Sequence, residues 1–328
     1  MANTRRPRHG SMQVWPRVRA GRIYKKVKRF PQSKEAKLLS FSGYKVGMTH
    51  IMVTDGRKYS MTKGEDITFP VTVIECPPIR IAGVRLYKKK GHAMQPATDI
   101  LAKADKELNR KIDAPKKESK KLDTVKVEDF DEMRVLIETQ PKMTGIGKKK
   151  PELFEASVGG NKEEKLKFAK ENLGKEVSIK DVYKEGQLVD IHAVTIGKGF
   201  QGPVKRFGVK VRSHKAEKTK RGPGSLGGWS AQGHVMYRVA HAGQMGYHNR
   251  VDYNKQILMI SDDPSKINVN GGHVGYGNVK NTYVLIKGSV AGPEKRIIRM
   301  EAARRPNPKT DLTLPTIQYI SLASKQGN

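Results

Sequence analysis

Two stretches of this chain carry many positive charges and almost no negative ones, which limits how they can fold. Residues 1–29 contain ten lysine or arginine side chains and no acid, and residues 198–250 contain eleven such cations and one acid, Glu217. Like charges at this density repel one another and oppose a compact state unless a partner neutralises them. Residues 101–150 differ, because they mix fourteen cations with ten acids as an ordinary solvated domain does. The sequence therefore predicts two segments that take their shape from a polyanion.

Nucleic acid is the polyanion that matches this charge best. The net charge over 328 residues is +32, whereas a magnitude of about 2–8 is enough to keep a small domain soluble. A duplex carries one phosphate per ~1.7 Å of its axis, so it can neutralise such a surface closely. Solubility alone does not explain the excess.

Several other classes of protein are excluded by composition. The one cysteine, Cys76, cannot form an internal disulfide or a thiolate zinc cage, and its place in IECPPI favours a buried strand. No run of about 18 apolar residues is present, so no membrane span is expected. The basic N-terminus does not fit a mitochondrial presequence, because Pro7, Gly10, Pro16 and Gly21 would break an amphipathic helix. It is predicted to be an extended arm.

Most of the remaining chain has the pattern of short strands separated by Gly, Pro and Asn. Asp55-Gly56 after the second strand is a strong hairpin signal. Many short strands with such punctuation are typical of a barrel or sandwich. The strands are expected at residues 38–42, 44–54, 68–75, 79–87, 135–138, 187–196, 257–260, 282–287, 296–300 and 316–321.

Residues 88–185 predict an α+β insertion. Ile100, Leu101, Ala104, Leu108 and Ile112 fall on one helical face after Thr98-Asp99, a suitable N-cap. A second helix is expected to begin at a capping box formed by residues 161–164 and to end at Gly174. Residues 197–250, with eleven glycines and four histidines, fit neither a helix nor a strand pattern.

One motif in the basic stretch suggests an enzyme. Gly197, Gly199 and Gly202 match G-x-G-x-x-G after an expected strand, the arrangement that binds a dinucleotide. However, Pro203 and Gly208 exclude a long helix after it, and Glu217 is not at a strand end. A chance match in a glycine-rich loop is favoured, and the glycines would then let the backbone approach phosphates. A DNA-compacting protein is the third alternative.

The sequence allows two roles for each of the tryptophan and histidine residues of the basic stretches. Trp229, between glycines, could anchor a small satellite core or stack on unstacked bases, and spacing alone does not separate these roles; Trp15 raises the same question. His234, His241 and His248 lack the neighbouring carboxylates of a metal or general-base site, so roles as donors or stacking groups against RNA are favoured.

Five longer segments together resemble the universal large-subunit ribosomal protein L3 family. They are RPRHGSMQVWPRVRA at 6–20, FSGYKVGMTH at 41–50, VDIHAVTIGKGFQG at 189–202, GGWSAQGHVMYRVAHAGQMGYHNR at 227–250 and KNTYVLIKGSVAGPEKR at 280–296. They occur in the family's order over almost the whole chain. The tryptophan-containing loop, the insertion and the compact length resemble the archaeal type.

The resemblance implies a mainly β fold: a translation-protein-like β-barrel with an α+β insertion and two long basic extensions that penetrate rRNA. The implied boundaries are 1–37 for the N-terminal extension, 38–87 and 186–328 for the barrel, 88–185 for the insertion and 198–250 for the central extension. A structural constituent of the large subunit follows, and no enzyme. It would bind 23S rRNA early in assembly and extend toward the peptidyl transferase centre to shape aminoacyl-tRNA accommodation.

The partners implied are 23S rRNA and neighbouring large-subunit proteins in the cytoplasmic ribosome, with no membrane, homo-oligomer, metal or cofactor. Gly228 occupies the place of a glutamine that is modified in bacterial members, so that modification is not expected. Lys220 lies near the position of a histidine that is modified in eukaryotic members, so that modification does not carry over.

Gly228, Trp229 and Ser230 are assigned to the loop tip near the peptidyl transferase centre. The residues predicted to bind rRNA are Arg5, Arg6, Arg8, His9, Trp15, Arg17, Arg19, Arg22, Lys25, Lys26, Lys198, Lys205, Arg206, Lys210, Arg212, His214, Lys215, Lys218, Lys220, Arg221, Trp229, His234, Arg238, His241, Gln244, His248 and Arg250.

Overall fold

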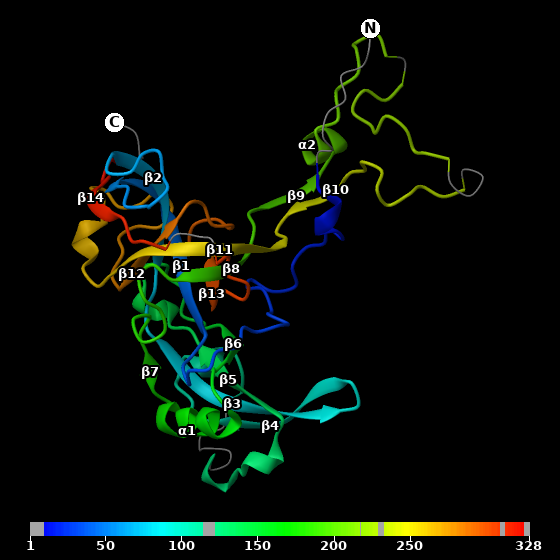
Figure 1. The fold of residues 1–328 in the computed structure, drawn as a ribbon. Coiled ribbons are helices and arrows are strands. Elements are labelled where there is room, and N and C mark those ends of the chain that lie inside the picture. Colours follow the sequence, from blue (N-terminus) through cyan, green and yellow to red (C-terminus); the bar gives the residue numbers. More distant parts are fainter. Residues whose placement is uncertain (1–9, 114–121, 217, 229–232, 309–311, 325–328) are drawn as a thin grey trace. The chain divides into compact units, whose positions relative to one another are not determined.

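The fold is built mainly of strands, which confirms the predicted class (Figure 1). The computed structural model describes residues 10–113, 122–216, 218–228, 233–308 and 312–324. Two compact units divide the chain. Unit 1 comprises Met1–Ile23 and Val194–Asn249, and unit 2 comprises Tyr24–Ala193 and Arg250–Asn328.

The larger sheet contains seven strands in the order β13-β8-β11-β12-β2-β1-β14. β1 also pairs with β13, through residues 40–44, so six of the strands form a closed circuit of hydrogen-bonded neighbours. β14 pairs with the other end of β1, at residues 51–54. The bounds are β1 (Ser40–Thr54), β2 (Asp66–Glu75), β8 (Leu188–Val194), β11 (Asn249–Ser261), β12 (Tyr283–Lys287), β13 (Ile297–Ala302) and β14 (Thr316–Ile320).

Apolar β-branched side chains of these strands are buried. Val73 and Ile74 on β2, Val284 on β12 and Ile298 on β13 are wholly buried. Such residues favour extended backbone because their branched Cβ packs well on a pleated surface. Burial of the apolar surface here supplies unit 2 with its core.

A second sheet, of five strands, belongs to the region between residues 79 and 177. Its path is β4-β3-β5-β6, with β7 also pairing with β3. Helix α1 (Lys162–Asn172) buries Leu166 and Ala169, and a capping box between Asn161 and Glu164 starts it as predicted. The strands are β3 (Ile79–Lys90), β4 (Ala93–Leu101), β5 (Glu132–Glu138), β6 (Leu153–Ser157) and β7 (Glu176–Val177).

The remaining elements are short. In unit 1, β9 (Gly197–Gln201) pairs with β10 (Gly243–Gly246), and α2 (Pro203–Phe207) follows β9. The 3-10 helices are η1 (Met12–Val14), η2 (Leu108–Arg110), η3 (Leu122–Thr124), η4 (Val127–Asp129), η5 (Pro141–Met143) and η6 (Pro264–Lys266). None of the helices in the described part of the chain is long and apolar enough to cross a membrane.

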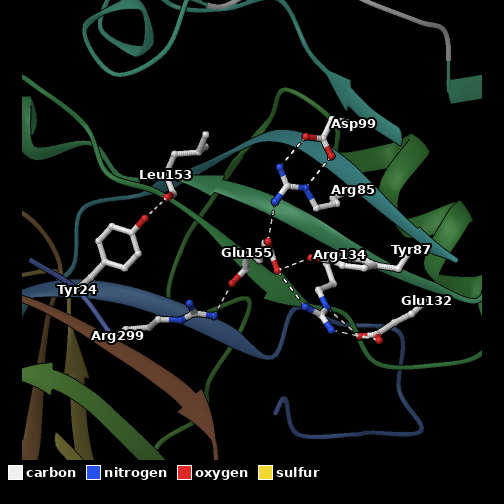
Figure 2. A network of polar contacts seen from close by, with 9 residues as sticks. All are labelled: Tyr24, Arg85, Tyr87, Asp99, Glu132, Arg134, Leu153, Glu155 and Arg299. Carbon is white, nitrogen blue, oxygen red and sulfur yellow. Dashed lines mark hydrogen bonds and ion pairs between the residues drawn. The ribbon is translucent and has the colours of Figure 1, made fainter. Parts of the chain in front are cut away.

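Glu155 joins the two sheets of unit 2 at the centre of a polar network (Figure 2). Its carboxylate accepts hydrogen bonds from Arg85 (2.7 Å), Tyr87 (2.8 Å) and Arg134 (3.0 Å), and its backbone oxygen accepts one from Arg299 on β13. Burial alone would raise the pKa of Glu155, but these donors hold it below its usual range. The network links β3, β5 and β6 to the seven-stranded sheet.

The same region anchors the chain just after unit 1. Tyr24 is buried, and its hydroxyl donates to the backbone oxygen of Leu153 over 2.7 Å. The Arg134 guanidinium lies 4.7 Å from the centre of the Phe30 ring. Residues 24–30, which fall inside the predicted N-terminal extension, are therefore held by unit 2.

One local prediction is wrong. The helix expected after Asp99 does not form, because Ile100 and Leu101 end strand β4, in which Ile100 is wholly buried and paired with Val84; the 3-10 helix η2 follows at Leu108–Arg110. The hairpin predicted at Asp55-Gly56 is confirmed by the antiparallel pairing of β1 with β2. Its connection is a loop over residues 55–65 instead of a tight turn, because the Asp55 carboxylate accepts hydrogen bonds from the side chains of Arg57 and Thr62.

Glu138 generates a prediction about stability and pH. Burial on β5 raises its pKa from 4.5 to about 7, against the opposing charge of Arg80. The folded state therefore holds a proton that the unfolded state has lost, so stability is greatest below the unfolded value of 4.5 and falls as pH rises toward 7. We expect Glu138→Gln to match the wild type near pH 4 and to exceed it in unfolding free energy at pH 8.

Chemical denaturation across this pH range measures the effect. Glu163→Gln, at an exposed position of α1, is the control and is expected to leave the profile unchanged. Parallel profiles for the wild type and Glu138→Gln would contradict the assignment.

Candidate nucleic-acid interface

A two-stranded ribbon forms the base of unit 1. β9 and β10 run antiparallel, with Gln201 opposite Gly243 and Phe200 opposite Gln244 (Figure 1). A register shift follows Gln244, where Gly246 adopts a φ of +69°. A Cβ at Gly246 would lie 2.0 Å from the Ile196 oxygen, so only glycine fits there.

The N-terminal segment adds to this base through its backbone. The Ala20 amide donates to the Tyr247 oxygen over 2.8 Å. His248 is buried, and its Nδ1 lies 2.8 Å from the Val18 oxygen. The Thr195 amide donates to the His248 oxygen over 3.0 Å. The two basic stretches are thus parts of one structural unit.

Trp15, Arg17, Phe207 and Tyr237 form an aromatic cluster in unit 1. The Trp15 and Phe207 rings stack with centroids 6.4 Å apart, and Tyr237 meets Trp15 edge-on at 5.6 Å. The Arg17 guanidinium lies 4.5 Å from the Phe207 ring centre. Such cation–π contacts contribute about 0.5–1 kcal/mol at exposed sites and more when desolvated. Of the two roles considered for Trp15, anchoring a small core or stacking on bases, the structure favours the first.

Arg206, on helix α2, forms hydrogen bonds with the backbone of residues 241–244. Its Nε donates to the Gln244 oxygen over 3.1 Å and its Nη1 to the His241 oxygen over 2.9 Å. Burial lowers the pKa of Arg206. Its guanidinium therefore stabilises the packing of this segment against α2, in addition to carrying a positive charge.

The charge of unit 1 is almost entirely of one sign. It holds 16 of the 64 lysine and arginine residues but only one of the 32 acids, Glu217. No ion pair joins two described residues of unit 1, because its described part contains neither Asp nor Glu. Its positive charge is available to an external anion.

Most predicted contact residues of unit 1 lie on its surface. This exposed set is Arg19, Arg22, Lys198, Lys205, Lys210, Arg212, His214, Lys215, Lys218, Lys220, Arg221, Gly228, His234, Arg238 and His241. Trp15, Arg17, Arg206 and Gln244 are half-buried, and the ring of His248 faces the backbone of the unit instead of its surface.

Three predicted cations lie in unit 2. Lys26 is exposed, whereas Lys25 and Arg250 are half-buried. Burial lowers the pKa of Lys25, and the charge of Arg250 lowers it further, so the two cations lie close enough to repel. Arg5, Arg6, Arg8, His9, Trp229 and Ser230 lie outside the described residues.

The dinucleotide alternative is wrong. Gly197 and Gly199 lie in β9, whose neighbour β10 is antiparallel, and the helix after Gly202 has five residues. A dinucleotide fold needs a parallel βαβ unit with a longer helix.

In the described part of the chain, no three His, Cys, Asp or Glu side chains lie close enough together to bind a metal ion.

Sequence reasoning missed three aromatic residues of unit 1. Phe207 is buried in the aromatic cluster, whereas Phe200 and Tyr237 are 77% and 68% exposed. The signal that could have found Phe200 is its position between glycines and lysines, where no core is available to cover a ring.

The family of the chain is decided by comparison with known proteins. The family model described as "Ribosomal protein L3" matches residues 1–327. The chain belongs to the ribosomal protein L3 family. This confirms the predicted resemblance and the prediction of a ribosomal protein, with its place in the cytoplasmic ribosome and no enzymatic role.

Three of the similar relatives are archaeal, in keeping with the predicted type. The chain is 46% identical over 337 residues to the large ribosomal subunit protein uL3 of Methanobrevibacter smithii, covering all of both chains. It is 44% identical over 328 residues to that of Archaeoglobus fulgidus, covering 98% of each, and 42% identical over 334 residues to that of Methanocaldococcus jannaschii, covering 99% of each.

The aromatic cluster generates a prediction for this L3-family chain. Phe207→Ala removes a buried ring, a change that costs about 3–5 kcal/mol in ordinary cores. We expect amides of β9 and β10 to lose most of their protection from hydrogen exchange in the free protein. Val18→Ala, at a residue 60% exposed, is the control and is expected to keep that protection. Equal exchange in both variants would show that the cluster does not hold the ribbon.

Proposed function

We propose that the chain is a structural constituent of the large ribosomal subunit and that it binds 23S rRNA through the surface of unit 1. The observation that carries this proposal is the concentration of 16 cations and one acid in a unit with almost no apolar core. Arg and Lys side chains bind phosphates and release condensed counterions, which supplies much of the affinity. Folded rRNA offers phosphates on several sides of such a segment.

Unit 2 serves as the anchor in this proposal. Its closed circuit of strands supports the translation-protein-like barrel that the family resemblance implies, and the second sheet supports an insertion, proposed at residues 88–185. The predicted boundaries, with extensions at 1–37 and 198–250, remain part of the proposal. Binding early in assembly would let rRNA fold around unit 1, while neighbouring subunit proteins and rRNA contact unit 2.

The central extension reaches toward the peptidyl transferase centre in this proposal, with Gly228, Trp229 and Ser230 at its tip. Gly228 and its neighbour Gly227 are exposed, and a Cβ at either would meet nothing within 4 Å. A tip of this kind can approach packed RNA closely and bias how aminoacyl-tRNA is accommodated.

The salt dependence of binding tests the rRNA interface. Replacing Lys210, Arg212, Lys215 and Lys218 with Gln removes four exposed cations of unit 1. Each cation that neutralises a phosphate contributes about 0.7–0.9 to the slope of log K against log salt, so we expect the slope to fall by about 3. The measurement is filter binding to an in vitro transcript of the large-subunit rRNA.

The control replaces four exposed lysines of unit 2 with Gln: Lys89, Lys90, Lys149 and Lys150. We expect it to change the slope by less than about 1. An equal change in both variants would mean that unit 1 is not the principal interface. Equal affinity for random duplex DNA would favour a general DNA-compacting role.

The loop tip has its own test. We expect Trp229→Ala to leave subunit assembly intact and to slow accommodation of aminoacyl-tRNA, because base–aromatic stacking is worth about 1–3 kcal/mol. The measurement is the rate of peptide-bond formation at limiting aminoacyl-tRNA, with Leu226→Ala, an exposed apolar position nearby, as the control. Normal rates in Trp229→Ala ribosomes would contradict this part of the proposal.

A further inference from the structure

Phe200 presents its ring to solvent in the middle of the β9–β10 ribbon. The residue is 77% exposed. It makes no aromatic or cation–π contact with any residue that the structure describes, in contrast to Phe207 in the same unit. A single exposed apolar side chain is common on proteins, so its surroundings decide whether this one has a partner.

Those surroundings are cationic and open. Lys198 and Lys205 are exposed on either side of Phe200 in the sequence. Gly199 has a φ of +65°, and a Cβ at either Gly199 or Gly202 would meet nothing within 4 Å. The backbone beside the ring is therefore accessible to a bulky ligand, and no described acid of unit 1 repels a phosphate.

Another exposed aromatic residue of the chain lacks this combination. Tyr59 is 90% exposed, but it lies on the 55–65 loop together with the acids Asp55 and Glu65, and Lys58 already lies 5.4 Å from its ring centre. Both rings are largely exposed, so exposure alone does not distinguish them. They differ in the charges of the neighbouring residues in the sequence, which include acids near Tyr59 but not near Phe200.

We propose that Phe200 stacks on an unpaired base of the large-subunit rRNA, with the adjoining phosphate held by Lys198 and Lys205. A nucleotide satisfies both features, since every base has a π face and every phosphate a negative charge. The G-x-G-x-x-G motif then serves a nucleotide of RNA instead of a dinucleotide cofactor. The inference rests on the proposed rRNA binding of unit 1 and names one of its contacts.

Three variants of the full chain test this contact: Phe200→Ala, Phe200→Trp and Tyr59→Ala. Affinity for the large-subunit rRNA transcript is measured at fixed salt. Base–aromatic stacking of about 1–3 kcal/mol corresponds to about 5- to 150-fold weaker binding by Phe200→Ala. Phe200→Trp keeps the stacking surface and is expected to bind within about twofold of the wild type, as is Tyr59→Ala. Thermal unfolding of each variant confirms that folding is retained.

Chemical probing of the rRNA in the complex provides the second readout. We expect Phe200→Ala to increase the reactivity of one nucleotide, or of a short single-stranded run, and Phe200→Trp to restore protection. Wild-type affinity for Phe200→Ala with an unchanged probing pattern would overturn the inference.

Two further outcomes separate this inference from the proposed function. Loss of a neighbouring protein from particles assembled with Phe200→Ala, with rRNA reactivity unchanged, would assign the ring to a protein contact and also overturn it. Failure of the wild-type chain itself to bind the transcript would refute the rRNA-binding proposal, whereas wild-type binding with no effect of Phe200→Ala would refute only the stacking contact.

Discussion

Repulsion among the cations of unit 1 is the constraint on which this structure depends. Sixteen lysine and arginine residues share the unit with one acid, so its charges have almost no internal counterpart. Ala20, Val194 and Phe207 are the buried apolar residues of its described part. Burying a Phe side chain stabilises a fold by about 1.5–3 kcal/mol, whereas ordering the backbone costs ~1–2 kcal/mol per residue. This imbalance is the basis of the proposal that a polyanion orders the rest.

The two parts of unit 1 respond to this constraint differently. Near its base, the Trp15–Phe207 stack brings together segments that are about 190 residues apart in the sequence, and the Arg206 hydrogen bonds and the β9–β10 pairing join segments about 40 residues apart. Between residues 208 and 240, the described chain has no strand or helix and no buried side chain. The base positions this loop, and in the proposed function rRNA phosphates around the loop give it its shape. Unit 2 instead pairs many of its cations with its own acids, as the ion pairs around Glu155 illustrate (Figure 2).

Much of unit 2 could be predicted from sequence, because its strands are local runs of β-branched residues bounded by turn signals. The strand expected at 282–287 is β12 (Tyr283–Lys287), and the capping box at Asn161 begins α1. The closed circuit could not be predicted, since the β1–β13 pairing joins residues more than 250 positions apart. Ile100 misled the helix prediction because its spacing suits a helix, whereas it is a buried residue of strand β4 opposite Val84.

The candidate interface likewise contains features that the sequence predicts and contacts that it does not. Charge and glycine content predicted that residues 1–29 and 198–250 bind nucleic acid, and five long segments predicted the family. Neither signal could indicate that Trp15 packs on Phe207 or that His248 faces the Val18 backbone, because these contacts depend on how distant segments return to one ribbon. The ring of Phe200 was missed because one aromatic residue in a glycine-rich motif has no periodicity.

Hydrogen exchange of the loop tests the central claim most directly. The amides of residues 208–216, 218–228 and 233–240 are followed in the free chain and in its complex with the large-subunit rRNA transcript. The account predicts rapid exchange in the free chain and strong protection in the complex. Protection of these amides in the free chain, equal to that in the complex, would show that the loop orders itself and would contradict the account.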